Sequence, residues 1–188
     1  MKTGKDVFIH SSAKIIHPER ITMGDSVIVD DFVLIYAGKS CTIGSFVHVG
    51  VSSSIGGGGE LVMEDFSGLS MGVRVLTGNE DFSGDSFTNP TVPEAYRRPI
   101  RSSVHIGKFA VLGANSVVLP GVTIGEGAVV GACSLVVRDC KPWTVYLGNP
   151  ARPVRPRPSE TLLQMERQLR EKVYDTRGRY IPKSDREA

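Results

Sequence analysis

The sequence has few aromatic residues, little excess of positive over negative charge and no long apolar runs. Aromatics make up 7% of the 188 residues, and the formal net charge is +2 at pH 7. So mild a charge gives no reason to expect nucleic acid or a membrane surface as the main partner. No stretch is long and apolar enough to span a bilayer, and the first ten residues lack the apolar region of a signal peptide. We therefore predict a cytoplasmic protein with no nucleic-acid partner and no membrane insertion.

Cysteine and histidine are also scarce. Cys41, Cys133 and Cys140 are odd in number and lack the close spacing of a zinc site. This pattern disfavours a disulfide scaffold and suits reduced thiols, and we expect no bound metal. The length fits one domain plus a tail, which is enough to bury a core.

What the sequence does contain is a repeat of six residues. A helix needs apolar residues three and four apart, and a flat strand alternates by two, so a period of six fits neither. It fits a chain that turns a corner every six residues, so that three short strands form one coil of a parallel β-helix. The repeated aliphatic positions are Met23, Val29, Ile35, Ile43, Val49, Ile55, Met63, Leu69, Val75, Ile106, Leu112, Val118, Ile124, Val130 and Val136.

A second register supports the β-helix, because the position four residues after most of these aliphatics is valine or small. We expect both registers to point inward. The early units are two residues longer than the later ones, and we expect the extra residues to bulge at one corner, at 38–41 and 57–60. Glycine often follows the aliphatic position, where a tight corner favours a residue free of Cβ strain. A sandwich of short strands is the alternative, but it has no reason to hold one phase across five units.

Two stretches resemble the hexapeptide-repeat transferases. They are Ile-Gly-Lys-Phe-Ala-Val-Leu-Gly-Ala-Asn-Ser-Val-Val-Leu-Pro-Gly-Val-Thr-Ile-Gly at 106–125 and Gly-Asn-Pro-Ala-Arg-Pro-Val at 148–154. The family includes galactoside, maltose, xenobiotic and nucleotide-sugar acetyltransferases. The resemblance runs over residues 9–154 and implies an all-β fold, a left-handed parallel β-helix. It also implies a homotrimer with active sites between subunits, and acetyl-CoA as the acyl donor.

The resemblance further implies which positions hold CoA along the later coils. The family binds CoA largely through backbone amides and small residues, and the matching positions here are Ala114, Ala132, Val137 and Arg138. We predict that Arg138 and Arg152 contact the charged end of CoA, because a guanidinium can bind a phosphate through two hydrogen bonds. Solvated surface arginine is the competing interpretation of both.

The six-residue rhythm stops between residues 79 and 103. An insert of this length is usually either a functional loop or disordered. Its first half is acidic, and its second half contains Tyr96, Arg97, Arg98 and Arg101. In similar enzymes such a loop reaches a neighbouring subunit and covers the acceptor site. We therefore predict that these four residues bind a sugar or nucleotide-sugar acceptor, with ion pairing inside the loop as the alternative role of the arginines.

The resemblance leaves the catalytic base open. Galactoside and maltose members place a histidine after Thr-Gly at the end of the coil before the insert, where this sequence has Asn79. An asparagine amide cannot act as a base at neutral pH. Glu80, Asp81 or His48 is a candidate to replace it, and His48 resembles a histidine of sialic-acid and bacillosamine-type members. Alternatively the acceptor is an amine that attacks with little help, or the enzyme is impaired.

The function predicted is acetyl-CoA-dependent acetylation of a sugar or nucleotide (amino) sugar in the biosynthesis of a surface polysaccharide such as lipopolysaccharide. We expect a β-helix domain at 1–154 and a tail at 155–188, in which the Ser159 side chain caps a helix that continues to about Asp175. A non-catalytic trimeric module is the main alternative. A γ-carbonic-anhydrase-like metalloenzyme is weaker, because the four histidines lack that family's close pair.

Overall fold

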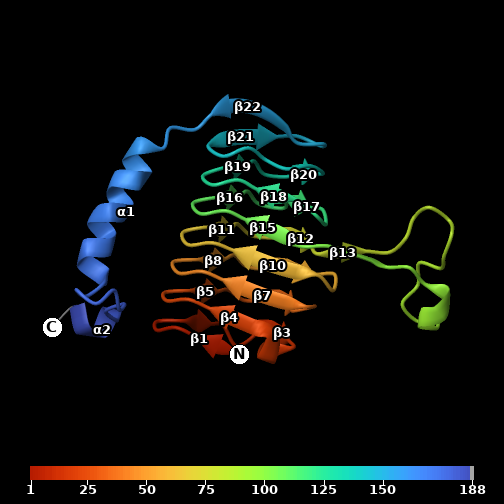
Figure 1. Ribbon diagram of the computed structural model, residues 1–188, viewed down its shortest axis with the longest axis horizontal. Coiled ribbons are helices and arrows are strands. Elements are labelled where there is room, and N and C mark those ends of the chain that lie inside the picture. Colours follow the sequence, from red (N-terminus) through yellow and green to blue (C-terminus); the bar gives the residue numbers. More distant parts are fainter. Residues whose placement is uncertain (187–188) are drawn as a thin grey trace.

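The chain winds into a three-sided parallel β-helix. The computed structural model describes residues 1–186, and three sheets, parallel except for the last strand of one of them, run along the stack of coils (Figure 1). Each strand lies against its equivalent in the next coil, so Val29 pairs with Val49 and Val49 with Leu69. The predicted β-helix is therefore confirmed.

The strands are short and are assigned here by sheet. Sheet A contains β1 (Lys2–Thr3), β4 (Ile21–Met23), β7 (Ser40–Ile43), β10 (Glu60–Met63), β15 (Val104–Ile106) and β18 (Thr123–Ile124). Sheet B contains β2 (Phe8–Ile9), β5 (Ile28–Val29), β8 (His48–Val49), β11 (Gly68–Leu69), β16 (Val111–Leu112), β19 (Val129–Val130), β21 (Thr144–Leu147) and β22 (Arg152–Pro156). Sheet C contains β3 (Lys14–Ile16), β6 (Leu34–Tyr36), β9 (Ser54–Gly56), β12 (Arg74–Leu76), β17 (Val117–Val118) and β20 (Leu135–Val136).

Both registers of the repeat fill the interior. All fifteen repeated aliphatic residues are buried, as predicted. The second register is buried as well, at Val27, Val33, Val47, Ser53, Ser67, Val73, Ala110, Ser116, Val122, Ala128 and Ser134. Large and small side chains thus alternate around each coil, and stacking the coils makes one continuous aliphatic core.

Glycine follows the aliphatic positions for a different physical reason from the predicted one, which was the conformation of a tight corner. At the corners the left-handed conformation is taken by other residues, including Phe46, Phe66 and Phe109, each with φ near 60°. Gly24 instead lies where two coils come close, because a Cβ there would be 2.5 Å from Ser45 Oγ. These glycines therefore serve the stacking of coils rather than the turn itself.

The three corners of the stack differ in their contents. The corner between sheets A and B, which we call the aromatic corner, stacks Phe46 on Phe66 (4.8 Å between ring centroids) and Phe66 on Phe109 (5.2 Å). The corner between sheets C and A, which we call the glycine corner, carries the turns at 37–39 and 57–59. The extra residues therefore share one corner as predicted, although β7 and β10 begin before the predicted bulges end.

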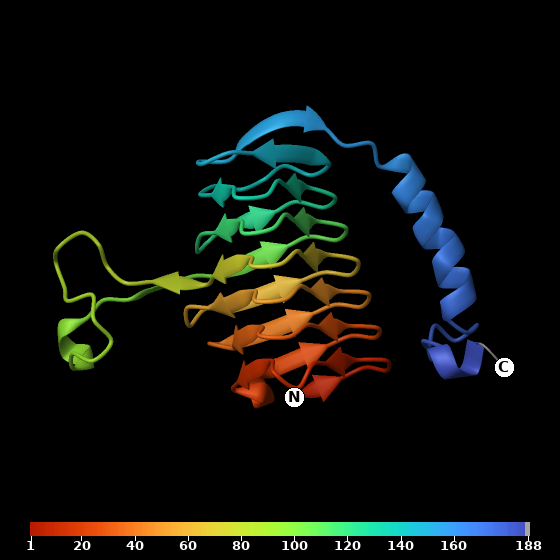
Figure 2. The same cartoon turned by 180° about the vertical axis from the view of Figure 1, so that it is seen from behind.

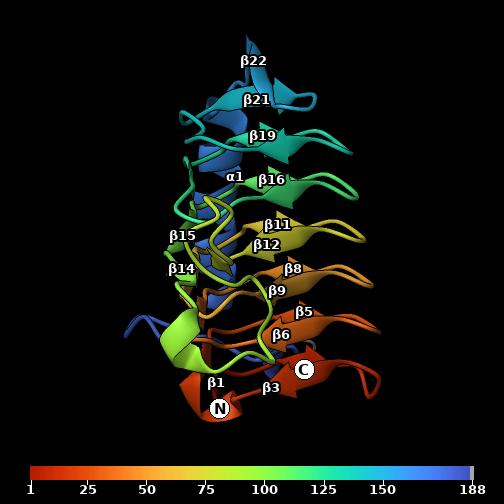
Figure 3. The ribbon, with the colours of Figure 1, turned by 90° about the vertical axis from the view of Figure 1, so that its right-hand side faces the viewer.

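The C-terminal segment descends along the aromatic corner. Helix α1 (Glu160–Val173) runs back from the last coil toward the first and ends near the short helix α2 (Lys183–Arg186) (Figures 1 and 3). Its Arg170 pairs with Asp65 at 2.8 Å, and the Tyr180 hydroxyl donates to Asp6 in the first coil at 2.9 Å. The helix was predicted within two residues at each end, but the Ser159 side chain makes no capping hydrogen bond.

The insert is an arm that projects from the glycine corner, on the side of the stack away from α1 (Figures 1 and 2). Its stem is the antiparallel pair β13 (Gly78–Asn79) and β14 (Ile100–Arg101), and a 3₁₀ turn covers Glu94–Tyr96. A second 3₁₀ turn, Pro18–Arg20, lies in the first coil. None of the helices in residues 1–186 is long and apolar enough to cross a membrane.

Candidate active site

The arm base and the turns of several coils meet at the glycine corner around a cavity of about 390 Å³. The coils bring these residues together because equivalent turns stack directly on one another. The lining residues are Arg20, Tyr36, Gly38, Gly57, Gly58, Gly78, Asn79, Glu80, Arg97, Pro99 and Arg101.

Close approach of backbones explains the glycines of this cavity. Gly57 has φ +127°, and a Cβ on it would lie 2.2 Å from the backbone nitrogen of Gly78. A Cβ on Gly38 would lie 2.3 Å from Cα of Gly58. Any side chain at these positions would force the turns apart, so the glycines hold the arm base against the coils and leave the cavity open.

Glu80 and Arg97 form the ion pair at the mouth of the arm. Arg97 Nη2 donates to Glu80 Oε1 at 2.5 Å, and the two side chains are only 16% and 23% exposed, arginine first. Glu80 Oε2 and Arg97 Nε are buried and have no hydrogen-bond partner within residues 1–186. Buried polar atoms rarely stay unpaired, so this pair keeps hydrogen-bonding capacity that residues 1–186 do not satisfy.

The neighbouring candidates Asn79 and Asp81 are occupied within the arm. Asn79 Oδ1 accepts the backbone N–H of Glu80 at 3.0 Å. Asp81 accepts the backbone N–H of Ser83 at 2.9 Å and the hydroxyl of Ser86 at 3.0 Å. The backbone and side-chain hydrogen bonds from Ser83 hold the pKa of the Asp81 carboxyl below its ordinary value. Asp81 therefore suits a role in ordering the arm better than that of a base.

His48 lies apart from these residues, in β8 of sheet B. Its Nε2 is 2.8 Å from Asp30 Oδ2, and the imidazole is exposed. It does not line the corner cavity of its own chain. Sequence reasoning found His48 but not its carboxylate partner, because Asp30 and His48 come together only through the pairing of β5 with β8.

The predicted CoA positions fall on both sides of sheet C. Arg138 and Arg152 line one cavity of about 290 Å³ at the C-terminal end of the stack, and Val137 is the neighbour of Arg138 in the same turn of the glycine corner. Ala114 and Ala132 stack at the corner between sheets B and C, where the carbonyl of Ala114 accepts the N–H of Cys133 at 2.8 Å. One chain thus gathers the two arginines but keeps the alanines on another edge.

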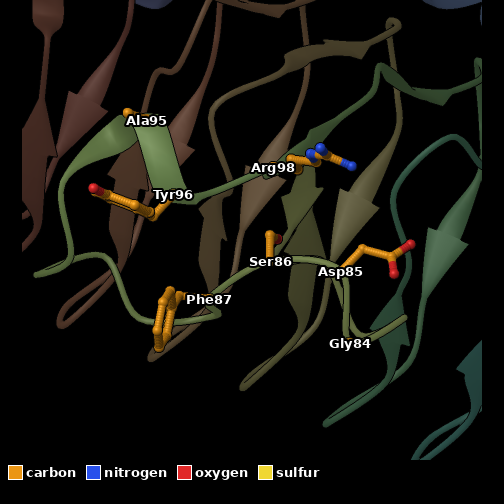
Figure 4. A pocket seen from close by; sticks show the side chains of 7 residues that line it. All are labelled: Gly84, Asp85, Ser86, Phe87, Ala95, Tyr96 and Arg98. Atoms are coloured by element: carbon orange, nitrogen blue, oxygen red, sulfur yellow. The ribbon is translucent and has the colours of Figure 1, made fainter.

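The four acceptor-binding candidates are also divided between two places. Arg97 and Arg101 line the corner cavity together with Asn79 and Glu80. Tyr96 and Arg98 line a separate hollow of about 370 Å³ in the outer part of the arm (Figure 4). The arm pairs only one of its predicted arginines, Arg97, with an acidic residue of residues 1–186, so the alternative of internal pairing holds in part.

Sequence reasoning missed Arg20 and Tyr36 in the corner cavity. Arg20 ends the 3₁₀ turn before β4 and Tyr36 comes just before the next turn at the same corner, and both are far from the insert in the sequence. The available signal was the register itself, since Tyr36 and Gly56 occupy equivalent positions in successive coils and Leu76 follows them. These residues all lie just before the corner from which the arm leaves.

Comparison with known proteins agrees with this architecture. Residues 103–138 match the bacterial transferase hexapeptide (six repeats) family. The chain is 38% identical to the dTDP-4-amino-4,6-dideoxy-D-glucose acyltransferase of Escherichia coli, over 87% of this chain and 85% of that protein. The chain belongs to the hexapeptide-repeat acyltransferases. The present chain is also 33% identical to the putative colanic acid biosynthesis acetyltransferase WcaF of Escherichia coli K12, over 83% of the present chain and 69% of WcaF.

Solved structures of acyltransferases share the fold of this chain. A mutant of AntD, an N-acyltransferase from Bacillus cereus, in complex with dTDP and coenzyme A matches with a TM-score of 0.85 and 33% identity, over 90% of this chain and 91% of AntD. The β-helix is therefore left-handed, as the resemblance implied. The protein is an enzyme, and the interpretation as a non-catalytic module is wrong. Within residues 1–186 no three histidine, cysteine or acidic side chains are grouped to hold a metal, so nothing there favours the anhydrase.

Proposed function

We propose that this acyltransferase moves an acetyl or related acyl group from a CoA thioester to the amino group of a nucleotide-linked deoxyamino sugar. The single observation that carries the proposal is the unpartnered Oε2 of Glu80, which is buried beside the corner cavity. Two relatives support the acceptor class by their names, a dTDP-amino-sugar acyltransferase and an N-acyltransferase bound to dTDP and CoA. The asparagine at the position of the histidine base in alcohol-acylating members agrees with an amine acceptor.

The proposed chemistry uses Glu80 at the attacking nitrogen. Arg97 holds Oε1, which leaves Oε2 to accept a hydrogen bond from the amine and orient its lone pair. The nitrogen attacks the thioester carbonyl carbon, the C–N bond forms and the C–S bond breaks. The proton lost by nitrogen passes to Glu80 Oε2 and then to the departing thiolate, which leaves as CoA thiol.

The CoA thioester is assigned to the groove along sheet C. Arg138 and Arg152 would bind the phosphates of CoA, since the two arginines share a cavity at one end of the stack. Val137, Ala114 and Ala132 would contact the pantetheine arm. Because the alanines lie on another edge of sheet C, two adjacent subunits are required to complete this groove.

A homotrimer is therefore part of the proposal. Exposed apolar side chains gather on sheet B and on the corner between sheets B and C, at Phe8, Ile28, Phe32 and Met71. Such a surface is typical of a subunit contact. His48 lies on the same sheet and would reach an active site only from a neighbouring subunit. Native mass spectrometry should give three times the chain mass of 20.3 kDa, and Phe32→Glu should shift it toward monomer.

Further proposals concern the domain bounds, the cellular location, the biosynthetic role and the outer part of the arm. The domain is assigned to residues 1–154 and the tail to 155–188, although β22 continues to Pro156 and residues 187–188 lie outside the described part. A role in surface-polysaccharide biosynthesis is supported by the colanic-acid relative. A cytoplasmic location is proposed because the substrates assigned here, a CoA thioester and a sugar nucleotide, are metabolites of the cytoplasm. Tyr96 and Arg98 would contact the acceptor or the neighbouring subunit from the arm.

The test of the function is acyl transfer in a purified system. With acetyl-CoA and dTDP-4-amino-4,6-dideoxyglucose, we expect CoA thiol release and an amide product identified by mass spectrometry. A matched 4-hydroxy sugar nucleotide serves as the control acceptor and should release no thiol above background. Acylation of the hydroxyl acceptor and not of any amine in a panel of amino-sugar nucleotides would overturn the proposal.

A further inference from the structure

The corner cavity carries more positive charge than the arm alone explains. Three arginines line it, and two of them, Arg97 and Arg101, come from the arm, whereas Arg20 comes from the first coil. Glu80 balances only one of the three. An excess of guanidinium groups around a concave site favours a ligand with more than one negative charge.

Arg20 is held at the edge of the cavity with donors to spare. It ends the 3₁₀ turn Pro18–Arg20, and its Nη1 donates to the carbonyl of Gly38. Its Nε is 3.6 Å from Glu19 Oε1, a weak contact at the surface. One nitrogen is thus anchored to a cavity-lining backbone group, and the other guanidinium N–H groups remain to bind an anion.

Arg101 lines the same cavity from the base of the arm, beside a glycine of the second turn. Its side chain lies over Gly58, where an added Cβ would be 3.1 Å from Arg101 Nε. Gly58 has φ +93°, a conformation that residues with a Cβ rarely adopt. A larger residue here would be strained and would also crowd the side chain of Arg101. Arg101 makes no ion pair with any side chain of residues 1–186, which leaves its full charge for a ligand.

Tyr36 supplies a flat apolar surface in the same cavity. The edge of His17 packs against it, with ring centroids 5.4 Å apart and planes at 70°. On the next coil, Gly56 has no side chain to cover the ring, and a Cβ there would lie 3.5 Å from Tyr36 Cβ. The ring is therefore fixed on one side and 37% exposed in total.

We propose that this cavity binds the nucleoside diphosphate of the acceptor, with Arg20 and Arg101 on the two phosphates and Tyr36 against the base. The assignment rests on the proposed function, because it places the sugar end beside Glu80, which lines the same cavity. Guanidinium groups suit phosphates through paired hydrogen bonds, and an aromatic ring stacks on a nucleobase without selecting strongly among bases.

The diphosphate of CoA is a second source of the same chemistry. The structure offers it a different place, because Arg138 and Arg152 line their own cavity at the C-terminal end of the stack. Nucleotide and CoA therefore have separate arginine pairs on one corner, and they should bind without competing for phosphate contacts.

Equilibrium binding of dTDP alone tests this inference without any turnover. We expect Arg20→Gln and Arg101→Gln each to raise the Kd of dTDP about tenfold or more, the loss of a charged hydrogen bond, and to leave the Kd of CoA within twofold. Arg138→Gln and Arg152→Gln are the matched controls and should do the reverse. Tyr36→Ala should weaken thymidine and dTDP by a similar factor but leave inorganic pyrophosphate unaffected.

Two outcomes separate this inference from the function on which it rests. Unchanged dTDP affinity in both Arg20→Gln and Arg101→Gln, or a loss of CoA affinity instead, overturns the assignment even if acyl transfer is normal. Tight dTDP binding that depends on these arginines, without acylation of any nucleotide-linked amine, supports the subsite and refutes the function. Should Arg20→Gln fail to fold, Arg20→Lys keeps the charge and gives the same comparison with a smaller rise in Kd.

Discussion

The aromatic corner and the glycine corner are built by the same repeat, yet one carries stacked aromatic side chains and the other carries glycine-rich turns. At the aromatic corner, Phe46, Phe66 and Phe109 stack on one another. Helix α1 lies beside this stack, and a cavity of about 320 Å³ remains between its Leu162 and Leu169 and the ring of Phe109. Charges at this corner are paired, since Glu166 contacts Lys108 at 2.6 Å and Arg170 at 2.5 Å. Glu166 therefore has two cationic partners at this corner.

The glycine corner lacks side chains where the aromatic corner carries stacked rings. Its turns lack side chains at Gly38, Gly57 and Gly58, and the arm leaves the stack there. Glu80 Oε2 and Arg97 Nε keep hydrogen-bonding capacity that residues 1–186 do not satisfy. We therefore expect the aromatic corner to contribute mainly to stability and the glycine corner mainly to ligand binding and catalysis, and five experiments test this division.

The largest expected effect is on stability at the aromatic corner. Phe109 is 6% exposed, so Phe109→Ala should lower the free energy of unfolding by about 3 kcal/mol. The rate of acyl transfer by the remaining folded enzyme should not change. Chemical denaturation and steady-state assays at a permissive temperature measure both. The control is Phe82→Ala on the arm, where the ring is 74% exposed and its loss should leave unfolding unaffected. A large fall in kcat in Phe109→Ala would break the division.

The next effect is catalytic and lies at the glycine corner. Glu80→Gln removes the charge that orients the amine and should lower kcat about 100-fold, which corresponds to about 2.7 kcal/mol of transition-state stabilisation. The melting temperature should change little. Asn79→Ala is the matched control and should lose less activity. A greater loss at Asn79 than at Glu80 would show that the base has been wrongly assigned.

A third variant tests whether the glycines hold the site open. A Cβ on Gly59 would lie 2.1 Å from the Ser102 carbonyl oxygen and 2.3 Å from that of Thr77. Gly59→Ala should therefore destabilise the fold by about 2 kcal/mol and displace the arm base, with loss of acyl transfer. Gly68→Ala has room, because its Cβ would meet only the His48 carbonyl oxygen at 3.8 Å, and it should behave like wild type. Equal stability of the two variants in denaturation curves would contradict the close-approach argument.

The fourth variant separates the two ends of the glycine corner. Arg152→Gln should raise KM for acetyl-CoA about tenfold through loss of a charged hydrogen bond, while KM for the amine stays unchanged. Arg155→Gln, on the same strand but outside the Arg138 cavity, is the control. A rise in the amine KM instead would place the acceptor, and not CoA, at this end.

The smallest effect concerns pH at the aromatic corner. Burial raises the pKa of Glu166, but hydrogen bonds from Lys108 and Arg170 outweigh it and bring the pKa below its ordinary value of 4.5. A pKa lowered by folding adds stability above the unfolded value, and this stability is lost as pH falls through the folded value. The melting temperature of Glu166→Gln should therefore fall less steeply than that of wild type below about pH 4.5. The exposed Glu171→Gln should follow wild type, and parallel curves for all three would exclude the effect.

Much of the fold could be predicted because its information is local. Period six, the two inward registers and the position of the insert all follow from the order of residues along the chain. The same reasoning misjudged why glycine follows the aliphatic residues, since close stacking is a contact between coils. It also missed that the insert has a stem, β13 with β14, because Gly78 and Ile100 carry no strand pattern of their own.

The site was predicted only in part for the same reason. Asn79, Glu80 and Arg97 share a cavity as their positions at the base of the insert suggested, and Arg138 meets Arg152. Tyr96 and Arg98 lie instead in the outer arm, and His48 lies in another sheet. A residue's distance along the chain from the insert says little about its distance in space when each coil returns to the same corner.

The sequence by itself determined that the chain coils, where its aliphatic core lies and where the arm leaves, because burial and turning are imposed on each residue by its near neighbours. Only the tertiary structure decided which outward side chains meet. Arg20 and Tyr36 join Glu80 and Arg101 around one cavity because stacked coils share a corner. That meeting depends on the register between coils, which no single coil encodes.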